Sequence, residues 1–258
     1  MSEHRIDLSI RDRVAHLRLA APERRNAVDS AFTQAFADAA LVCDAQSDAL
    51  AAILIDAEGD LFSVGGDIDE FLAHADDVEA HVLKMSATFH VGISALARAK
   101  APVVVAARGM VAGGAVSLLS LADIAIAGES MRVCAAFTRT GLTPDGGATF
   151  FLTRALGYQR AFDILALNPV LTAEDALRIG LVSRVHADAE LDGEVGKLLD
   201  KLRGMPPGTL GTLKRLMRGA LTASLDDQLA AEERTIAASA ARPETMALLR
   251  AFLARSGR

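Results

Sequence analysis

The feature that most constrains the fold is a set of short, continuously apolar segments that alternate with segments of helical periodicity. Three apolar segments are residues 51–57 (AAILIDA), 102–107 (PVVVAA) and 123–127 (DIAIA). A strand that is apolar on both sides must be covered on both faces of its sheet, which is typical of parallel sheets with helical crossovers. Between and before these segments, apolar side chains recur at helical spacing in residues 31–46, 78–99 and 113–121. This order predicts an α/β fold.

The two ends of the chain differ from this middle part. Residues 6–10 and 13–19 alternate apolar and polar side chains, which predicts a β-hairpin. Beyond about residue 188 the strand signals stop, and apolar side chains recur at helical spacing. We therefore predict a core over residues 1–200 and a helical C-terminal segment over residues 201–258. The apolar faces of that segment are expected to pack on the core or on another subunit, where they would serve oligomerisation.

Charge and composition exclude several classes of function. The 258 residues carry 27 Lys and Arg against 33 Asp and Glu, a net charge of −6. This balance offers no net attraction to phosphate, so neither nucleic acid nor an anionic membrane is an expected partner. Aromatic residues make up 4%, with no Trp, which also disfavours a surface for stacking bases.

The cysteines and the N-terminal residues bear on the compartment. Cys43 and Cys134 have no further Cys or His at ligand spacing, so neither a metal site nor a disulfide framework is expected. The first residues, MSEHRIDLSIRDR, lack the apolar stretch of a secretory signal. We expect a cytoplasmic protein.

Three glycine-containing turns stand out as places for chemistry. They are Leu61–Ile68 (LFSVGGDI), Gly109–Ala115 (GMVAGGA) and Thr143–Gly147 (TPDGG). Glycine pairs let a backbone approach a ligand closely, and a helix that begins at the second motif would point the Gly114 N–H outward as an anion site. The second motif fits neither a phosphate-binding P-loop nor a dinucleotide fingerprint. For each motif a purely structural role remains open: a tight turn, close helix packing and a helix cap by Asp145.

Taken together, the motifs indicate a protein family more specifically than any one motif does alone. In order, the landmarks are Pro22–Ala27 (PERRNA), Phe62–Ile68, Gly109–Ala115, Gly141–Gly147, Leu171–Ala176 and Gly180–Val182. In the order and spacing of these landmarks the chain resembles the enoyl-CoA hydratase/isomerase family, also called the crotonase superfamily. The resemblance runs from about residue 5 to the C-terminus. It implies a crotonase-like spiral of ββα repeats with a helical C-terminal segment.

The resemblance also implies how an acyl-CoA thioester would bind. Backbone N–H groups at Val64 and Gly114 match the pair that holds the thioester oxygen, where an enolate would place its negative charge. The positions that match CoA contacts are Arg25, Ala27, Ser63, Gly65, Asp67 and Ile68. Phe89 and Phe137 match the acyl pocket. No cofactor is implied beyond the coenzyme A of the substrate itself.

The expected acid–base residues depart from the hydratase pattern. Hydratases of the family use two glutamates, and the matching positions here are Ser117 and Phe137. Asp145 matches an aspartate used by family isomerases of the dienoyl-CoA and phenylacetyl-CoA-pathway (epoxide or oxepin) types. The same position is the nucleophile in aryl-CoA dehalogenases, which carry a histidine where His90 stands. Those dehalogenases also line their acyl pocket with tryptophan, which this chain lacks. An accessory role of His90 and a merely structural one both remain open.

The sequence therefore predicts an enzyme that shifts a double bond of an unsaturated acyl-CoA, with Asp145 as the catalytic residue. The alternatives are an enoyl-CoA hydratase, a dehalogenase-like hydrolase and a non-catalytic acyl-CoA-binding protein. By resemblance we expect a homotrimer or a dimer of trimers, acting in fatty-acid metabolism or aromatic degradation.

Overall fold

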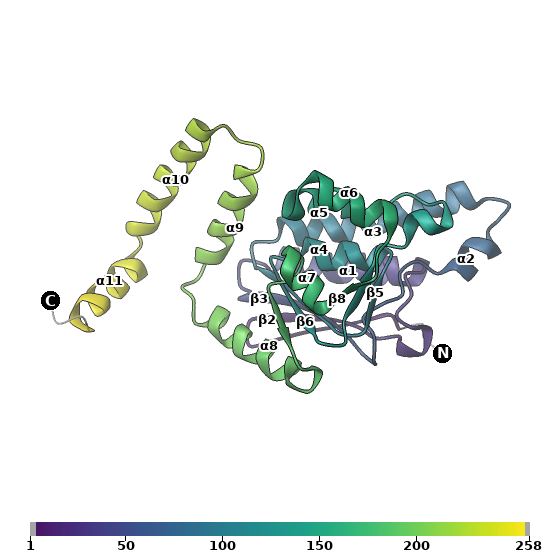
Figure 1. The fold of residues 1–258 in the computed structure, drawn as a ribbon. Coiled ribbons are helices and arrows are strands. Elements are labelled where there is room, and N and C mark those ends of the chain that lie inside the picture. The colour runs from purple at the N-terminus through teal and green to yellow at the C-terminus, as the bar shows by residue number, and fades with distance from the viewer. Residues whose placement is uncertain (1–3, 256–258) are drawn as a thin grey trace.

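The computed structural model describes residues 4–255 and places a six-stranded sheet at the centre of the molecule (Figure 1). In spatial order its strands are β1 (Ile6–Arg11), β2 (Val14–Leu19), β3 (Ala52–Ala57), β4 (Val103–Ala107), β6 (Ile124–Gly128) and β9 (Arg184–His186). Strands β1 and β2 form the predicted antiparallel hairpin, and all other neighbours are parallel. The predicted α/β class is confirmed.

A second, smaller sheet lies beside the first and is less visible in the sequence. Its strands are β5 (Met110–Ala112), β7 (Arg132–Cys134) and β8 (Leu171–Thr172). The sequence prediction treats residues 109–115 as a turn that leads directly into a helix, and for residues 110–112 it is wrong. Strand β5 is too short to show a period of its own, and its conformation comes from parallel pairing with β7, about twenty residues further on.

Helices connect the strands and complete the chain. They are α1 (Ser30–Ala45), α2 (Ile68–Ala73), α3 (Val78–Arg98), α4 (Gly114–Leu121), α5 (Ala148–Leu156), α6 (Tyr158–Leu167), α7 (Ala173–Ile179), α8 (Asp188–Arg203), α9 (Thr209–Ala220), α10 (Leu225–Ala240) and α11 (Pro243–Arg255). Single 3-10 turns occur at Pro22–Arg24 and Phe137–Thr140. Asp29 caps α1 by accepting from the Phe32 N–H at 2.7 Å.

The main sheet is buried on both faces, as its apolar strands require. In β3, Ile53 and Ile55 pack into the cluster formed with α1, α3 and α4, whereas Leu54 faces the other side. There α8 covers the sheet with Leu191 and Leu198 among its buried side chains. Burying an aliphatic side chain of this size contributes about 1.5–3 kcal/mol, so this double coverage stabilises the sheet that carries the glycine loops.

The last two helices extend away from this core. Helix α8 remains on the sheet up to Arg203, α9 lies beside the body, and α10 and α11 reach away from it (Figure 1). Helix α10 has no buried residue, and Leu225 and Ile236 are both exposed. The division near residue 200 and the use of the helices in oligomerisation remain predictions.

Candidate active site

The first two glycine motifs lie against each other at the carboxyl ends of β3 and β4. The Ser63 N–H donates to the Met110 carbonyl at 3.0 Å, and the Ala112 N–H donates to the Ser63 carbonyl at 3.0 Å. A Cβ on Gly65 would lie 2.6 Å from the Ala112 oxygen, and Gly65 has φ +83°. Only glycine fits this position, which explains why the first motif needs it.

Two backbone amides predicted to hold a thioester oxygen belong to these motifs. Helix α4 begins at Gly114 after a glycine cap with φ +50°, and no side chain caps it. The first N–H groups of a helix lack an intrahelical acceptor, so the Gly114 amide is a suitable donor to an oxyanion. The Val64 N–H donates to the Arg25 carbonyl over 3.3 Å, a long hydrogen bond. A ligand oxygen at Val64 would have to share or replace it.

The third motif is fastened to the same helix. The Ser117 hydroxyl, one turn after Gly114, donates to the Asp145 carbonyl oxygen at 2.6 Å. Gly146 follows with φ +62°, and a Cβ there would lie 2.5 Å from a ring carbon of Phe89. Ser117 is therefore an anchor of the Asp145 turn, although the sequence marks it only as a missing glutamate.

The Asp145 carboxylate is held by two side chains of α3. The His90 Nε2 lies 2.5 Å from Oδ1 of Asp145, and the Ser86 hydroxyl donates to Oδ2 at 3.0 Å. The side chains of His90 and Asp145 are 50% and 36% exposed, so a ligand can reach the pair. The structure thus joins His90 to Asp145. Ser86 is absent from the sequence prediction, and its only sequence signal is its place one helical turn before His90.

The loop that carries the predicted CoA contacts is built around a buried asparagine. The Asn26 side chain accepts from the Ala21 N–H at 2.9 Å and donates to the carbonyls of Glu58 and Leu61. This anchors the loop beside the first glycine motif, where the Val28 N–H donates to the Gly65 carbonyl at 2.8 Å.

Two neighbouring arginines in this loop have different surroundings. Arg24 is paired with Asp67 at 3.0 Å, and Asp67 also caps α2 by accepting from the Glu70 N–H. Arg25 is exposed with φ +55°, and no carboxylate pairs with it among residues 4–255. Arg25 is thus the arginine of this loop that is available to a phosphate group.

The other predicted contact residues differ in accessibility. Ser63 is fully buried, and its hydroxyl accepts from the Gly65 N–H, so it shapes the loop. Ala27 is buried, whereas Ile68 is 48% exposed. Phe89 and Phe137 both belong to the main core, and Phe89 packs on Phe36 beneath the Asp145 turn, with ring centroids 5.4 Å apart.

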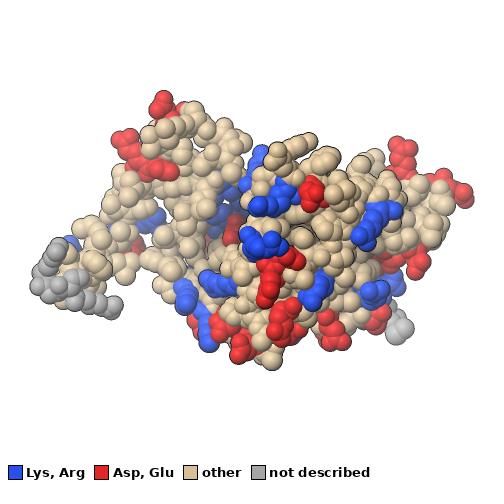
Figure 2. Space-filling view, viewed as in Figure 1, with Lys and Arg blue, Asp and Glu red and all other residues tan. Residues whose placement is uncertain are grey.

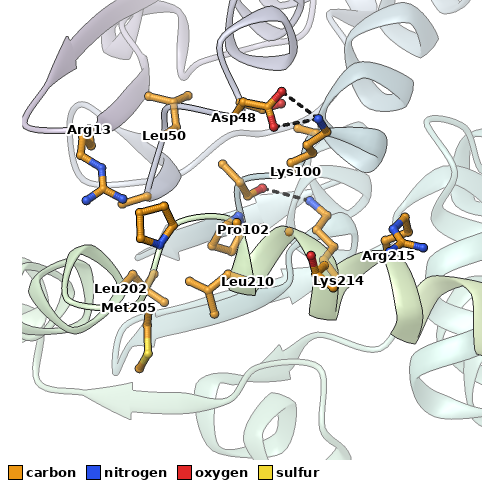
Figure 3. A pocket seen from close by; sticks show the side chains of 18 of the residues that line it. Arg13, Asp48, Leu50, Lys100, Pro102, Leu202, Met205, Leu210, Lys214 and Arg215 are labelled. Atoms are coloured by element: carbon orange, nitrogen blue, oxygen red, sulfur yellow. Dashed lines mark hydrogen bonds and ion pairs between the residues drawn. The ribbon is translucent and has the colours of Figure 1, made fainter. Parts of the chain in front are cut away.

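A separate pocket of about 540 Å³ lies under α9 and contains none of the predicted site residues (Figure 3). Lys214 enters it from α9, pairs with Asp123 at 2.7 Å and donates to the carbonyls of Leu96 and Ala101. Burial lowers the pKa of Lys214, although the nearby Asp123 opposes this shift. Helix α9 is therefore attached to the core through a buried ion pair.

Surface charge and grouped metal ligands are two further features that can mark a functional site. Acidic and basic side chains are interspersed over the body on the face seen in Figure 2. Within residues 4–255 no three His, Cys, Asp or Glu side chains are grouped to hold a metal ion. None of the helices described there has the length and apolarity needed to cross a bilayer.

The arrangement of loops and strands is that of a known enzyme family. The family model for enoyl-CoA hydratase/isomerase matches residues 9–255, so the chain belongs to this family. The 4-chlorobenzoyl coenzyme A dehalogenase-2 of an Arthrobacter species is 27% identical over 259 residues, covering 99% of this chain and 94% of that protein. The 1,2-epoxyphenylacetyl-CoA isomerase of Escherichia coli strain K12 is 36% identical over 134 residues, covering 52% of this chain and 51% of the isomerase.

Solved structures agree with this assignment and confirm the crotonase-like fold. An enoyl-CoA hydratase/isomerase family protein from Mycobacterium abscessus superposes with a TM-score of 0.92 at 30% identity, covering 97% of this chain and 96% of that one. A Thermobifida fusca relative, crystallised with acetoacetyl-CoA, has a TM-score of 0.84 at 28% identity over 92% of this chain and 95% of its own.

Proposed function

We propose that the protein is an isomerase that shifts the double bond of an unsaturated acyl-CoA thioester. The observation that carries the proposal is the partly exposed Asp145 carboxylate, which stands on a turn whose Asp145 backbone carbonyl is held by Ser117 of the helix that begins at Gly114. Enolate formation requires a base near an oxyanion site, and here the turn that carries the base is fastened to the helix that carries the oxyanion donor. Ser117 and Phe137 offer no second carboxylate, and moving a proton within one substrate needs a single base.

The reaction balances with this chain's own groups. For a 3-enoyl-CoA, Asp145 takes a proton from the carbon next to the thioester carbonyl, and the electron pair forms a dienolate. The N–H groups of Val64 and Gly114 hold the resulting oxyanion; one such donor typically contributes about 3–4 kcal/mol to transition-state stabilisation. Asp145 then returns the proton at the far end of the allylic system, which leaves the double bond conjugated with the carbonyl.

A second candidate is hydrolytic dehalogenation of an aryl-CoA. Two observations favour it: the contact between His90 and Asp145, and similarity to the 4-chlorobenzoyl-CoA dehalogenase along nearly the whole chain. In that reaction Asp145 would attack the ring carbon that bears the halogen and expel halide. His90 would then deprotonate the water that cleaves the aryl ester and releases Asp145.

A panel of CoA thioesters separates these activities. We would incubate the protein with 3-enoyl-, dienoyl-, 2-enoyl- and 4-chlorobenzoyl-CoA and identify the products by mass and chromatography. An isomerase gives a product of unchanged mass, a hydratase adds one water, and a dehalogenase replaces chlorine by hydroxyl and releases chloride. Binding of all the thioesters without turnover would support the non-catalytic alternative and contradict the proposal.

We also propose that the protein works as a homotrimer or a dimer of trimers. The exposed apolar side chains of α10 and α11, such as Ile236 and Leu248, support association between copies. Light scattering at micromolar concentration should give the mass of three or six chains, and a monodisperse monomer would contradict the proposal.

A further inference from the structure

We propose that Ser86 is a positioning residue for Asp145, acting through its hydroxyl on the Oδ2 oxygen. The inference rests on the proposed function, in which Asp145 is the residue that moves the proton. None of the expected family contacts includes Ser86. It stands on α3 and is partly buried, with its hydroxyl 3.0 Å from Oδ2.

The argument begins with the freedom of an aspartate carboxylate. The torsion that turns its plane is broad, so a single hydrogen bond leaves the carboxylate able to swing about that contact. His90 engages Oδ1 and Ser86 engages Oδ2, so both oxygens are held at once. Two contacts on different oxygens fix the plane of the group and thereby the direction in which its remaining lone pairs point.

Ser86 and His90 stand on one helix, which keeps their two contacts with the Asp145 carboxylate in fixed positions. Residues 86 and 90 are four apart within the continuous helix α3, so their side chains project from the same helical face. The backbone of Asp145 is fixed separately by Ser117 of α4. The turn is thus held by one helix and its carboxylate by another, and misalignment by about 1 Å can cost a reaction about 100-fold in rate.

Removal of the hydroxyl should also change the pH dependence of the reaction. A donor that hydrogen-bonds to a carboxylate stabilises its charged, basic form, and loss of the donor favours protonation. A Ser86→Ala enzyme should therefore need a higher pH to reach its maximal rate. If the Ser86 side chain served folding alone, its removal would not change the pH dependence of the rate.

The experiment follows deuterium incorporation from heavy water into 3-hexenoyl-CoA by the full-length protein across pH. For Ser86→Ala we expect kcat to fall about tenfold, with KM little changed and the acid limb of the rate profile moved to higher pH. Ser86→Thr keeps a hydroxyl and should recover most of the rate. Ser86→Cys places a weaker donor in the same space, gives an intermediate rate and serves if the alanine variant does not fold.

The matched control is Ser94→Ala, which removes a hydroxyl one turn beyond His90 on the same helix. Ser94 is exposed and has no hydrogen bond to Asp145, so its loss should leave rate and profile unchanged. An unchanged kcat and pH profile in Ser86→Ala, or a Ser86→Thr protein no better than the alanine variant, would overturn the inference. Asp145→Asn measured alongside separates the claims. If it is inactive while Ser86→Ala is normal, only the role of Ser86 fails; if it is active, the proposed function fails.

Discussion

Gly146 gives the sharpest test of how the Asp145 turn is built. Alanine there would have to adopt φ +62° and place its Cβ 2.5 Å from a ring carbon of Phe89 and 2.9 Å from Cβ of Ser117. The left-handed backbone alone costs about 1 kcal/mol relative to glycine. The overlap adds about 1–3 kcal/mol, because Phe89 and the anchored Ser117 can move only by disturbing the core. We therefore expect Gly146→Ala to lower the free energy of unfolding by about 2–4 kcal/mol.

Gly141 provides the matched control, since it has φ +75° and nothing within 4 Å of a built Cβ. Gly141→Ala should cost only the backbone part, about 1 kcal/mol. Urea unfolding of both variants, followed by circular dichroism, isolates the contact part by subtraction. Gly146→Ala should also lose turnover of the panel's best thioester, because the turn that carries Asp145 is displaced. Equal destabilisation of the two variants, with full activity in Gly146→Ala, would refute this reasoning.

Three further changes probe the loop, the sheet and the C-terminal helices. Arg25→Ala should raise KM for CoA thioesters about fivefold in steady-state kinetics, and less at high salt because the contact is exposed; an unchanged KM would remove Arg25 from the site. Burial alone would raise the pKa of Asp56, but hydrogen bonds from His16 and Arg18 outweigh burial and lower it. The resulting stability is present above the ordinary aspartate pKa and is lost as pH falls through the lower folded value. Asp56→Asn should cost about 1–2 kcal/mol in urea unfolding at pH 7 and much less at pH 2, and a loss that does not depend on pH would contradict this. Lys214→Ala should cost about 3 kcal/mol in the same assay, because Asp123 loses a buried partner; a cost below about 1 kcal/mol would show that the ion pair does not hold α9.

The sequence predicted the features whose causes are local. Strand β3 is apolar along its length because both faces are covered, and the cap of α1 needs only Asp29 and the next turn. The three glycine motifs could be identified because backbone conformation and close approach restrict the residue type there. Strand β5 could not, since its partner β7 lies elsewhere in the chain. The contact of Ser86 could not be predicted for the same reason, because the fold brings its hydroxyl to a carboxylate 59 residues away.

The role of Ser117 shows how a substitution can be misjudged from sequence alone. At that position the hydratase pattern has a glutamate, and its replacement suggests a lost function. In the folded chain the serine hydroxyl holds the Asp145 carbonyl at 2.6 Å and so supports the residue that replaces the glutamate in our proposal. That hydrogen bond joins residues from two separate motifs and is invisible in either one.

The central claim is that Asp145 transfers the proton, and the most direct test is solvent-deuterium exchange into 3-hexenoyl-CoA by the wild type and Asp145→Asn. Asparagine keeps the shape and the hydrogen-bonding oxygen of the side chain but has no basic carboxylate. Loss of a general base typically lowers the rate about 100-fold or more, and we predict a fall of this size in a protein that melts within a few degrees of the wild type. Equal exchange by the two proteins would contradict the account and would reduce Asp145 to a structural residue of its turn.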